Sequence, residues 1–158
     1  MKANAKKETI YANIIMLAVF FFAFLGTEYL FDNCMMYVTD ASGVVRAQNQ
    51  MLGVSAIGFL LYNWISGFFA VKSPWVTGGT GLLAFGIGAG CMGCIILHAG
   101  YVQMMIAGGV LFFLLGVVGA GVHYQMAYSV YDRAMLARCV GFAYAGGIFL
   151  QFLNNNMI

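Results

Sequence analysis

The chain has 158 residues, of which 63% are hydrophobic and 8% are charged, and its formal net charge is +2. Soluble domains are about half apolar and about a quarter charged, and a chain of this length still leaves about a third of its surface in water. This composition therefore excludes a single soluble domain. It also excludes a disordered chain and a nucleic-acid-binding domain, which needs a basic surface.

Five long apolar runs follow one another along the sequence, separated by short polar or turn-forming segments. A helix needs about 20 mostly apolar residues to cross a lipid bilayer. Unbroken runs differ from the alternating strands of a membrane β-barrel, and a helix satisfies its own backbone hydrogen bonds in lipid. We therefore expect an all-α membrane protein with transmembrane helices at residues 10–31 (continuing toward 38), 44–71, 76–97, 101–130 and 134–153.

The predicted domain organisation is simple. Residues 1–9 form a cytoplasmic N-terminal tail, residues 10–153 the five-helix transmembrane domain and residues 154–158 a short C-terminal tail. The apolar stretch after the basic N-terminus is too long for a signal-peptide core and lacks a small-residue cleavage site. We therefore expect the first run to remain as a membrane helix.

Basic residues indicate the orientation of these helices. If the N-terminus is cytoplasmic, only Arg46 lies on the outer side. The basic residues on the inner side are then Lys2, Lys6, Lys7, Lys72, Arg133 and Arg138. Because cytoplasmic loops carry an excess of Lys and Arg, the sequence predicts that the N-terminus lies inside and the C-terminus outside.

Glycine is abundant, with 21 residues concentrated in the last three runs. Gly86 and Gly90 are four residues apart, and small residues at this spacing let membrane helices approach each other closely. Gly116, Gly119 and Gly121 follow in the fourth run. The glycines predict a tightly packed helix bundle.

Glu28 and Asp32 are the strongest candidates for a functional site. They are four residues apart and therefore lie on one face of the first helix. Glu28 is roughly 7–8 Å beyond the middle of its run at 1.5 Å per residue. An ionisable group at that depth is costly to charge and is a candidate proton or solute contact. In the alternative interpretation, the helix ends near Tyr29 and both acids are in water.

His123, Tyr124 and Gln125 form a second candidate group, toward the cytoplasmic half of the fourth helix. A polar triplet within an apolar run is not expected to face lipid, and it would line a water-filled cavity. The alternative is an interfacial position, because tyrosine favours the headgroup region. His123 and Glu28 are expected at different depths and are not paired with each other.

The remaining polar residues are more typical of helix packing than of a catalytic or ligand-binding site. Gln48, Ser55, Tyr62 and Ser66 lie on one stripe of the second helix, where most such residues form helix–helix hydrogen bonds. The motif Cys91-Met92-Gly93-Cys94 has no second ligand pair, so a metal site is not predicted. We find no nucleophile–base arrangement and no phosphate loop, and we expect neither an enzyme nor a cofactor.

The order of these features resembles the N-terminal half of a major facilitator superfamily transporter, over residues 10–153. Residues 65–72, Ile-Ser-Gly-Phe-Phe-Ala-Val-Lys, are similar to the family's loop motif G-x-L-A-D-x-x-G-R. Gly67 and Ala70 match it and Lys72 keeps a positive charge, but Val71 stands where the motif has Asp. Residues 116–121 are similar to the family's glycine-rich fourth helix, and residues 131–138 to its basic link to helix five.

The resemblance implies transport of a small solute by alternating access, with proton coupling as one option. It implies a multi-pass protein of the cell membrane, in bacteria the cytoplasmic (inner) membrane. Family members have two six-helix halves with the site between them. A sixth helix and a C-terminal half, or a second protomer, would then complete the molecule. By analogy the first and fourth helices line the pathway, which selects Glu28, Asp32, His123, Tyr124 and Gln125.

Another interpretation remains open. Some bacterial transcriptional regulators carry a similar membrane module fused to a helix-turn-helix domain. In such a protein this segment would sense a signal without transporting, and it would make no direct contact with nucleic acid.

Overall fold

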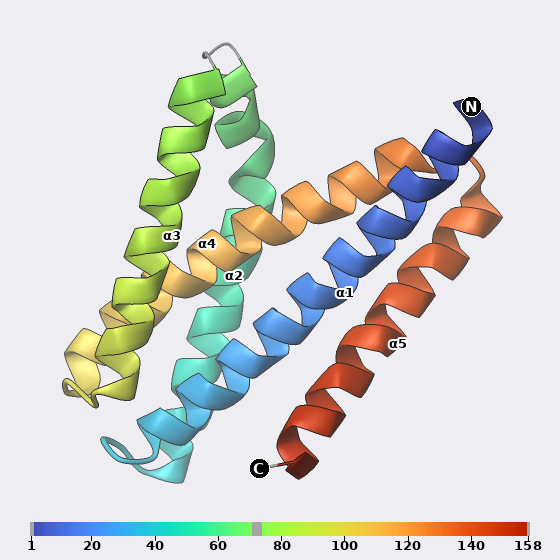
Figure 1. Ribbon diagram of the computed structural model, residues 1–158. Helices are drawn as coiled ribbons and strands as arrows, with labels where there is room; N and C mark the ends of the chain where they lie inside the picture. Colours follow the sequence, from blue (N-terminus) through green and yellow to red (C-terminus); the bar gives the residue numbers. More distant parts are fainter. Residues whose placement is uncertain (1, 71–73, 158) are drawn as a thin grey trace. The chain divides into compact units, whose positions relative to one another are not determined.

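The computed structural model describes residues 2–70 and 74–157, and this part of the chain forms five α-helices and no strand (Figure 1). The helices are α1 (Lys2–Met35), α2 (Ala41–Ala70), α3 (Pro74–Ile96), α4 (Tyr101–Ser129) and α5 (Arg133–Met157). Each predicted apolar run corresponds to one helix, which confirms the all-α fold class. Lys72 and Val71, on which part of the predicted orientation and motif depends, lie outside the described residues.

All five helices contain a stretch long and apolar enough to cross a membrane. These stretches are Glu8–Met35, Ala41–Phe68, Gly79–Ile96, Tyr101–Ser129 and Arg133–Asn156. Many large apolar side chains on their surfaces are exposed, including Leu60, Leu82 and Phe85. Such surfaces need an apolar environment, which is compatible with a multi-pass membrane protein.

The helix ends differ from the predicted ones for local reasons. We predicted that the second helix begins at residue 44, whereas α2 already begins at Ala41 because Asp40 caps it. The Asp40 carboxylate accepts hydrogen bonds from the Gly43 backbone N–H and the Ser42 hydroxyl, both at 2.9 Å. This is the geometry of an Asp N-cap. These two bonds, first that from Gly43, lower the pKa of Asp40 from its usual 3.8.

The turn between α3 and α4 contains the two positive-φ residues of the described chain. Gly100 has φ 117°, and His98 has φ 50° although it is not glycine. The backbone N–H of Ala99 donates to the Cys94 carbonyl at 3.3 Å and that of His98 to the Ile95 carbonyl at 3.1 Å. These bonds make a Schellman ending of α3, in which glycine normally occupies the position of His98. The His98 ring packs against Tyr37, with ring centroids 4.5 Å apart.

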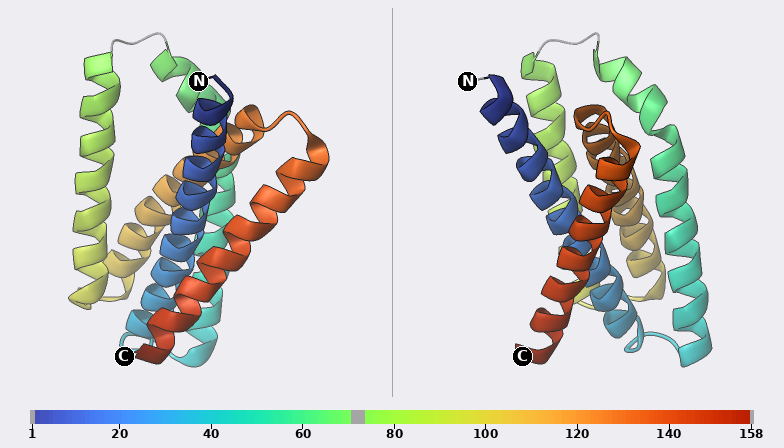
Figure 2. Two further views of the ribbon diagram at one scale, coloured as in Figure 1. Left: turned by 45° about the vertical axis from the view of Figure 1, so that its right-hand side comes forward. Right: turned by 90° about the vertical axis from the view of Figure 1, so that its right-hand side faces the viewer.

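The chain divides into two compact units, and the boundaries fall inside α1 and α4. The first unit contains residues up to Thr27 and from Gly119 onward, and the second contains Glu28–Val118. The links between α1 and α2 and between α4 and α5 are short, as both views of Figure 2 show. The segments on the two sides of each link belong to the same unit.

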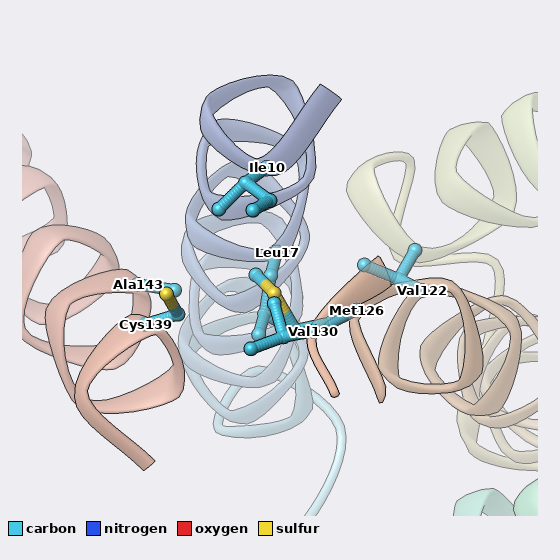
Figure 3. Packing of buried hydrophobic residues seen from close by; sticks show 7 residues of the cluster. All are labelled: Ile10, Leu17, Val122, Met126, Val130, Cys139 and Ala143. Carbon is cyan, nitrogen blue, oxygen red and sulfur yellow. The ribbon is translucent and has the colours of Figure 1, made fainter. Parts of the chain in front are cut away.

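The core of the first unit lies where α1, α4 and α5 meet. The buried residues there are Ile10, Leu17, Val122, Met126, Val130, Cys139 and Ala143 (Figure 3). Close approach of α5 to α1 is possible because Gly147 has no side chain. A Cβ at that position would lie 2.9 Å from the Ala18 carbonyl oxygen and 3.0 Å from the Phe21 Cβ.

The core of the second unit is built on a close crossing of α2 and α4. A Cβ at Gly58 would overlap the Phe113 carbonyl oxygen, and one at Gly116 would overlap the Ser55 carbonyl oxygen. The two backbones therefore touch at this crossing. Phe31 of α1 is buried nearby and meets Phe112 edge-on at 5.7 Å.

The predicted close packing does not extend to Gly86 and Gly90 of α3. A Cβ at Gly86 or Gly90 would have nothing within 4 Å, and the same holds for Gly79, Gly81 and Gly93. These residues, which we predicted to make helix contacts, face open space within the described structure. The crossing at Gly58 and Gly116 is where glycine permits backbone contact.

Candidate functional site

Glu28 and Asp32 lie one turn apart on the last part of α1, in the second unit. The Gln48 side-chain amide of α2 donates a hydrogen bond of 2.7 Å to Glu28 Oε1. Both carboxylic acids are half-buried. The helix continues to Met35, so it does not end near Tyr29 as the alternative interpretation supposed.

One buried carboxylate oxygen of this pair, Asp32 Oδ1, lacks a hydrogen-bond partner among the described residues. The neighbouring Phe31, Cys34 and Met35 are buried apolar side chains. A buried polar atom without a partner is costly, and in native proteins it calls for a specific explanation.

The carboxylate pair offers mainly hydrogen-bond acceptors. Ionised carboxylates accept only, and the one donor seen at the pair, the Gln48 amide, is directed at Glu28. Such an arrangement suits a proton, a monovalent cation or an ammonium group, and it disfavours an anion. Among residues 8–68 and 79–156, whose side chains the structure describes, no group of three or more His, Cys, Asp and Glu residues is placed to hold a metal ion.

His123 belongs to a separate arrangement in the first unit. Its Nδ1 lies 2.7 Å from the Gly119 carbonyl oxygen, and its Nε2 lies 2.6 Å from the Tyr144 hydroxyl on α5. Because a carbonyl oxygen can only accept, Nδ1 donates to Gly119, and Nε2 shares the second hydrogen bond with the Tyr144 hydroxyl. Both ring nitrogens of His123 are therefore engaged within the protein.

Aromatic rings of α1 enclose this His123–Tyr144 pair. Phe20 meets the His123 ring edge-on at 6.3 Å, and Phe21 stacks on Tyr144 at 4.4 Å with an interplanar angle of 14°. Gly119 makes room for Phe20, since a Cβ there would lie 2.5 Å from the end of the ring. The pair thus joins α4 to α5 and packs against α1.

The structure does not bring Tyr124 and Gln125 to His123. Both side chains are exposed, and Tyr124 stacks on Tyr128 with centroids 6.2 Å apart. Tyr144, which sequence reasoning missed, takes the place beside His123.

A simple signal would have found one of the two missed partners. In two antiparallel helices joined by a short link, residues equidistant from the link face each other. Residues 28 and 48 are centred on residue 38, in the turn between α1 and α2, whereas residues 123 and 144 are centred between 133 and 134, inside α5, so this rule does not lead to Tyr144. Of the predicted polar stripe on α2, Gln48 reaches another helix, whereas Ser55 and Ser66 donate within α2, to Leu52 and Asn63.

Other buried polar groups in the first unit have partners within the protein. The Asn13 amide of α1 donates to the Ser129 hydroxyl of α4 at 2.6 Å, and the Thr27 hydroxyl donates within α1 to the Ala23 carbonyl at 2.8 Å. Gln151 is buried on α5 and directs its Oε1 toward Gly26, where that atom has no partner among the described residues. A single orphaned amide oxygen suits an internal water.

No protein-family model matches the chain, and no similar curated protein or solved structure was found. The resemblance to the major facilitator superfamily therefore rests on the residues quoted above. The function has to be argued from the geometry of the two sites.

Proposed function

We propose that this chain is a multi-pass membrane protein that moves a small solute across the bilayer by alternating access, with Glu28 and Asp32 as its proton or cation contact. The observation that supports this most directly is the buried, unpartnered Asp32 Oδ1, one turn from Glu28. A stable structural carboxylate would be expected to have its oxygens satisfied.

The chemistry of the pair favours a cationic solute or a proton. A proton on either acid, or a cation near Asp32 Oδ1, would supply what this oxygen lacks. Gln48 holds Glu28 from α2, so a change at the carboxylates acts on the contact between two helices. Ion and solute sites in transporters are built in this way, from polar groups inside an otherwise apolar bundle.

The family resemblance extends this proposal to topology. The N-terminus would be cytoplasmic and the C-terminus outside, in the cytoplasmic membrane of a bacterium. A C-terminal half or a second protomer would complete the pathway, because alternating access needs two bodies that rock around one site. We include Glu28, Asp32 and His123 in that pathway, with Tyr124 and Gln125 at its margin.

The experiment is a flux measurement on the full chain in lipid vesicles with an entrapped pH indicator. The external probes are Na⁺, K⁺, ammonium, methylammonium and choline, each tested with and without an imposed pH gradient. Asp32→Asn and Glu28→Gln keep the shape of each side chain and remove its charge. Asp132→Asn, at an exposed carboxylate between α4 and α5, is the matched control.

We expect wild type and Asp132→Asn to move at least one of these cations, or protons, well above empty vesicles. The Asp32→Asn and Glu28→Gln vesicles should remain at the background. Undiminished flux in both variants would remove the carboxylate pair from the mechanism. Absence of any cation or proton flux in wild type would refute the proposal and favour the sensor interpretation.

A further inference from the structure

Cys91 and Cys94 are neighbours on the surface of α3, near its C-terminal end in the second unit. The helix continues to Ile96, so both cysteines are helical and are about 60° apart around the helix axis. Side chains at this spacing face each other. A charge on Cys94 acts on the Cys91 thiol, as expected for two sulfurs that lie close together. Cys91 is half-buried and Cys94 is exposed, so a ligand can approach the pair from one side.

Helix packing, the role that the sequence suggested for this motif, does not account for the pair. A Cβ at Gly90, one turn before Cys94, would meet nothing within 4 Å among the described residues, and the same holds at Gly93. The buried residue of this turn is Ile95, which is 1% exposed. The side of α3 that carries Cys94 therefore has room for a ligand beside the two sulfurs.

The spacing of the two side chains suits a bridging metal ion better than a disulfide. Helical residues three apart have Cβ atoms about 5–6 Å from each other. A relaxed disulfide needs its Cβ atoms about 3.5–4.5 Å apart, so the helix would have to distort to form one. Two metal–sulfur bonds of about 2.3 Å place the sulfurs up to about 4.6 Å apart. Each sulfur reaches that separation by leaning slightly toward the other from its Cβ.

The number and type of ligands select the metal. No third His, Cys, Asp or Glu joins the pair among the side chains that the structure describes, and the ring of His98 packs against Tyr37 instead. Zinc takes four ligands and is therefore a poor match, as are calcium and magnesium, which bind oxygen. Thiolates select Cu(I), a closed-shell ion that accepts two sulfurs in a linear arrangement.

We propose that Cys91 and Cys94 form a two-thiolate site for one Cu(I) ion at the end of α3. The ion displaces both thiol protons, which pass to water, and two copper–sulfur bonds form while copper stays Cu(I). The C-terminal end of a helix carries a partial negative charge, which disfavours two bare thiolates and favours a bound cation. Cys94 is two residues, about 3 Å, from the end of the apolar stretch Gly79–Ile96, so the site is not deep in an apolar environment, where charge is costly.

The experiment titrates the reduced full chain in detergent micelles with Cu(I), without oxygen, against the coloured Cu(I) chelator bicinchoninate. Cys91→Ser and Cys94→Ser each remove one sulfur of the pair. Cys34→Ala and Cys139→Ala remove the two buried cysteines and are the first controls. The matched control combines Gly93→Cys with Cys94→Ala. It keeps two thiols in a position where a Cβ fits, but places them about 160° apart around the helix.

We expect wild type and both buried-cysteine variants to bind one Cu(I) ion per chain, with two sulfur ligands and no nitrogen in the X-ray absorption spectrum. Affinity should fall more than about 100-fold in Cys91→Ser, in Cys94→Ser and in the matched control, beyond the loss caused by an outer-shell change.

Undiminished affinity in any of these three variants would overturn the proposal. So would an equal loss in Cys34→Ala or Cys139→Ala, a nitrogen or third sulfur ligand, or absence of Cu(I) binding in wild type. This test does not depend on solute movement, so it stands or falls separately from the proposed transport.

Discussion

Replacing Gly116 with alanine should separate α2 from α4. A Cβ at Gly116 would overlap the Ser55 carbonyl oxygen and would lie 2.8 Å from the Ser55 carbonyl carbon and 3.1 Å from the Phe59 nitrogen. Ordinary contacts of a Cβ lie at 3.4–4 Å. All three neighbours are backbone atoms, so no side-chain rotation relieves the overlap and the helices have to move apart.

The expected magnitude follows from two opposing effects. Overpacking a close contact costs about 1–3 kcal/mol, and a backbone clash belongs at the upper end of that range. Alanine regains up to about 1 kcal/mol of helix propensity over glycine. Gly116→Ala should therefore lower the free energy of unfolding by about 2 kcal/mol. Gly90→Ala is the matched control, because a Cβ there would meet nothing within 4 Å, and it should raise stability by up to about 1 kcal/mol.

The assay is reversible unfolding of both variants in mixed detergent micelles, followed by circular dichroism. Gly58→Ala should behave like Gly116→Ala, since its Cβ would overlap the Phe113 carbonyl oxygen at the same crossing. The double variant should lose less than the sum of the two, because one clash already separates the helices. Equal changes in Gly116→Ala and Gly90→Ala would refute the α2–α4 crossing.

Two smaller predictions concern the helix ends. His98→Gly should be more stable than His98→Ala by about 1 kcal/mol in the same unfolding assay. Both variants lose the imidazole ring, but only glycine adopts φ 50° without strain. Equal stability of the two variants would contradict a strained backbone at residue 98. The folded-state pKa of Asp40 is lowered, so its stabilisation is fully present above the usual value of 3.8 and is lost as the pH falls through the folded-state pKa. Wild type should therefore lose stability relative to Asp40→Asn between pH 7 and about pH 3, because asparagine also caps the helix but does not titrate. Parallel pH profiles would show that the charge of Asp40 contributes nothing to the cap.

The positions of the helices could be predicted from the sequence because length and hydropathy leave few options. An apolar run of about 20 residues between polar breaks is compatible with little except a membrane helix. The ends were less predictable because capping decides them. Residues 39–43 are of the types found in turns. The Asp40 carboxylate nevertheless accepts a hydrogen bond from the Gly43 backbone N–H and so begins α2 within this segment.

Side-chain partners were harder to predict than helices. The spacing of Glu28 and Asp32 was enough to place both on one face, because it depends on one helix only. The contact of His123 with Tyr144 depends on the register of two helices, and adjacency in the sequence favoured Tyr124 instead. The contacts of the glycines were equally hard to predict. Gly86 and Gly116 have similar sequence surroundings, but of these two only Gly116 lies at a crossing of two helices.

The two polar arrangements are suited to different roles because one is satisfied and the other is not. His123 uses both nitrogens inside the protein, so a solute could bind it only by displacing Tyr144. Asp32 has a buried oxygen available, so a cation or a proton can bind it without breaking a protein contact. Solute contact is therefore better assigned to the carboxylate pair. The histidine is better assigned to holding α4 and α5 together, through the hydrogen bond between its Nε2 and the Tyr144 hydroxyl.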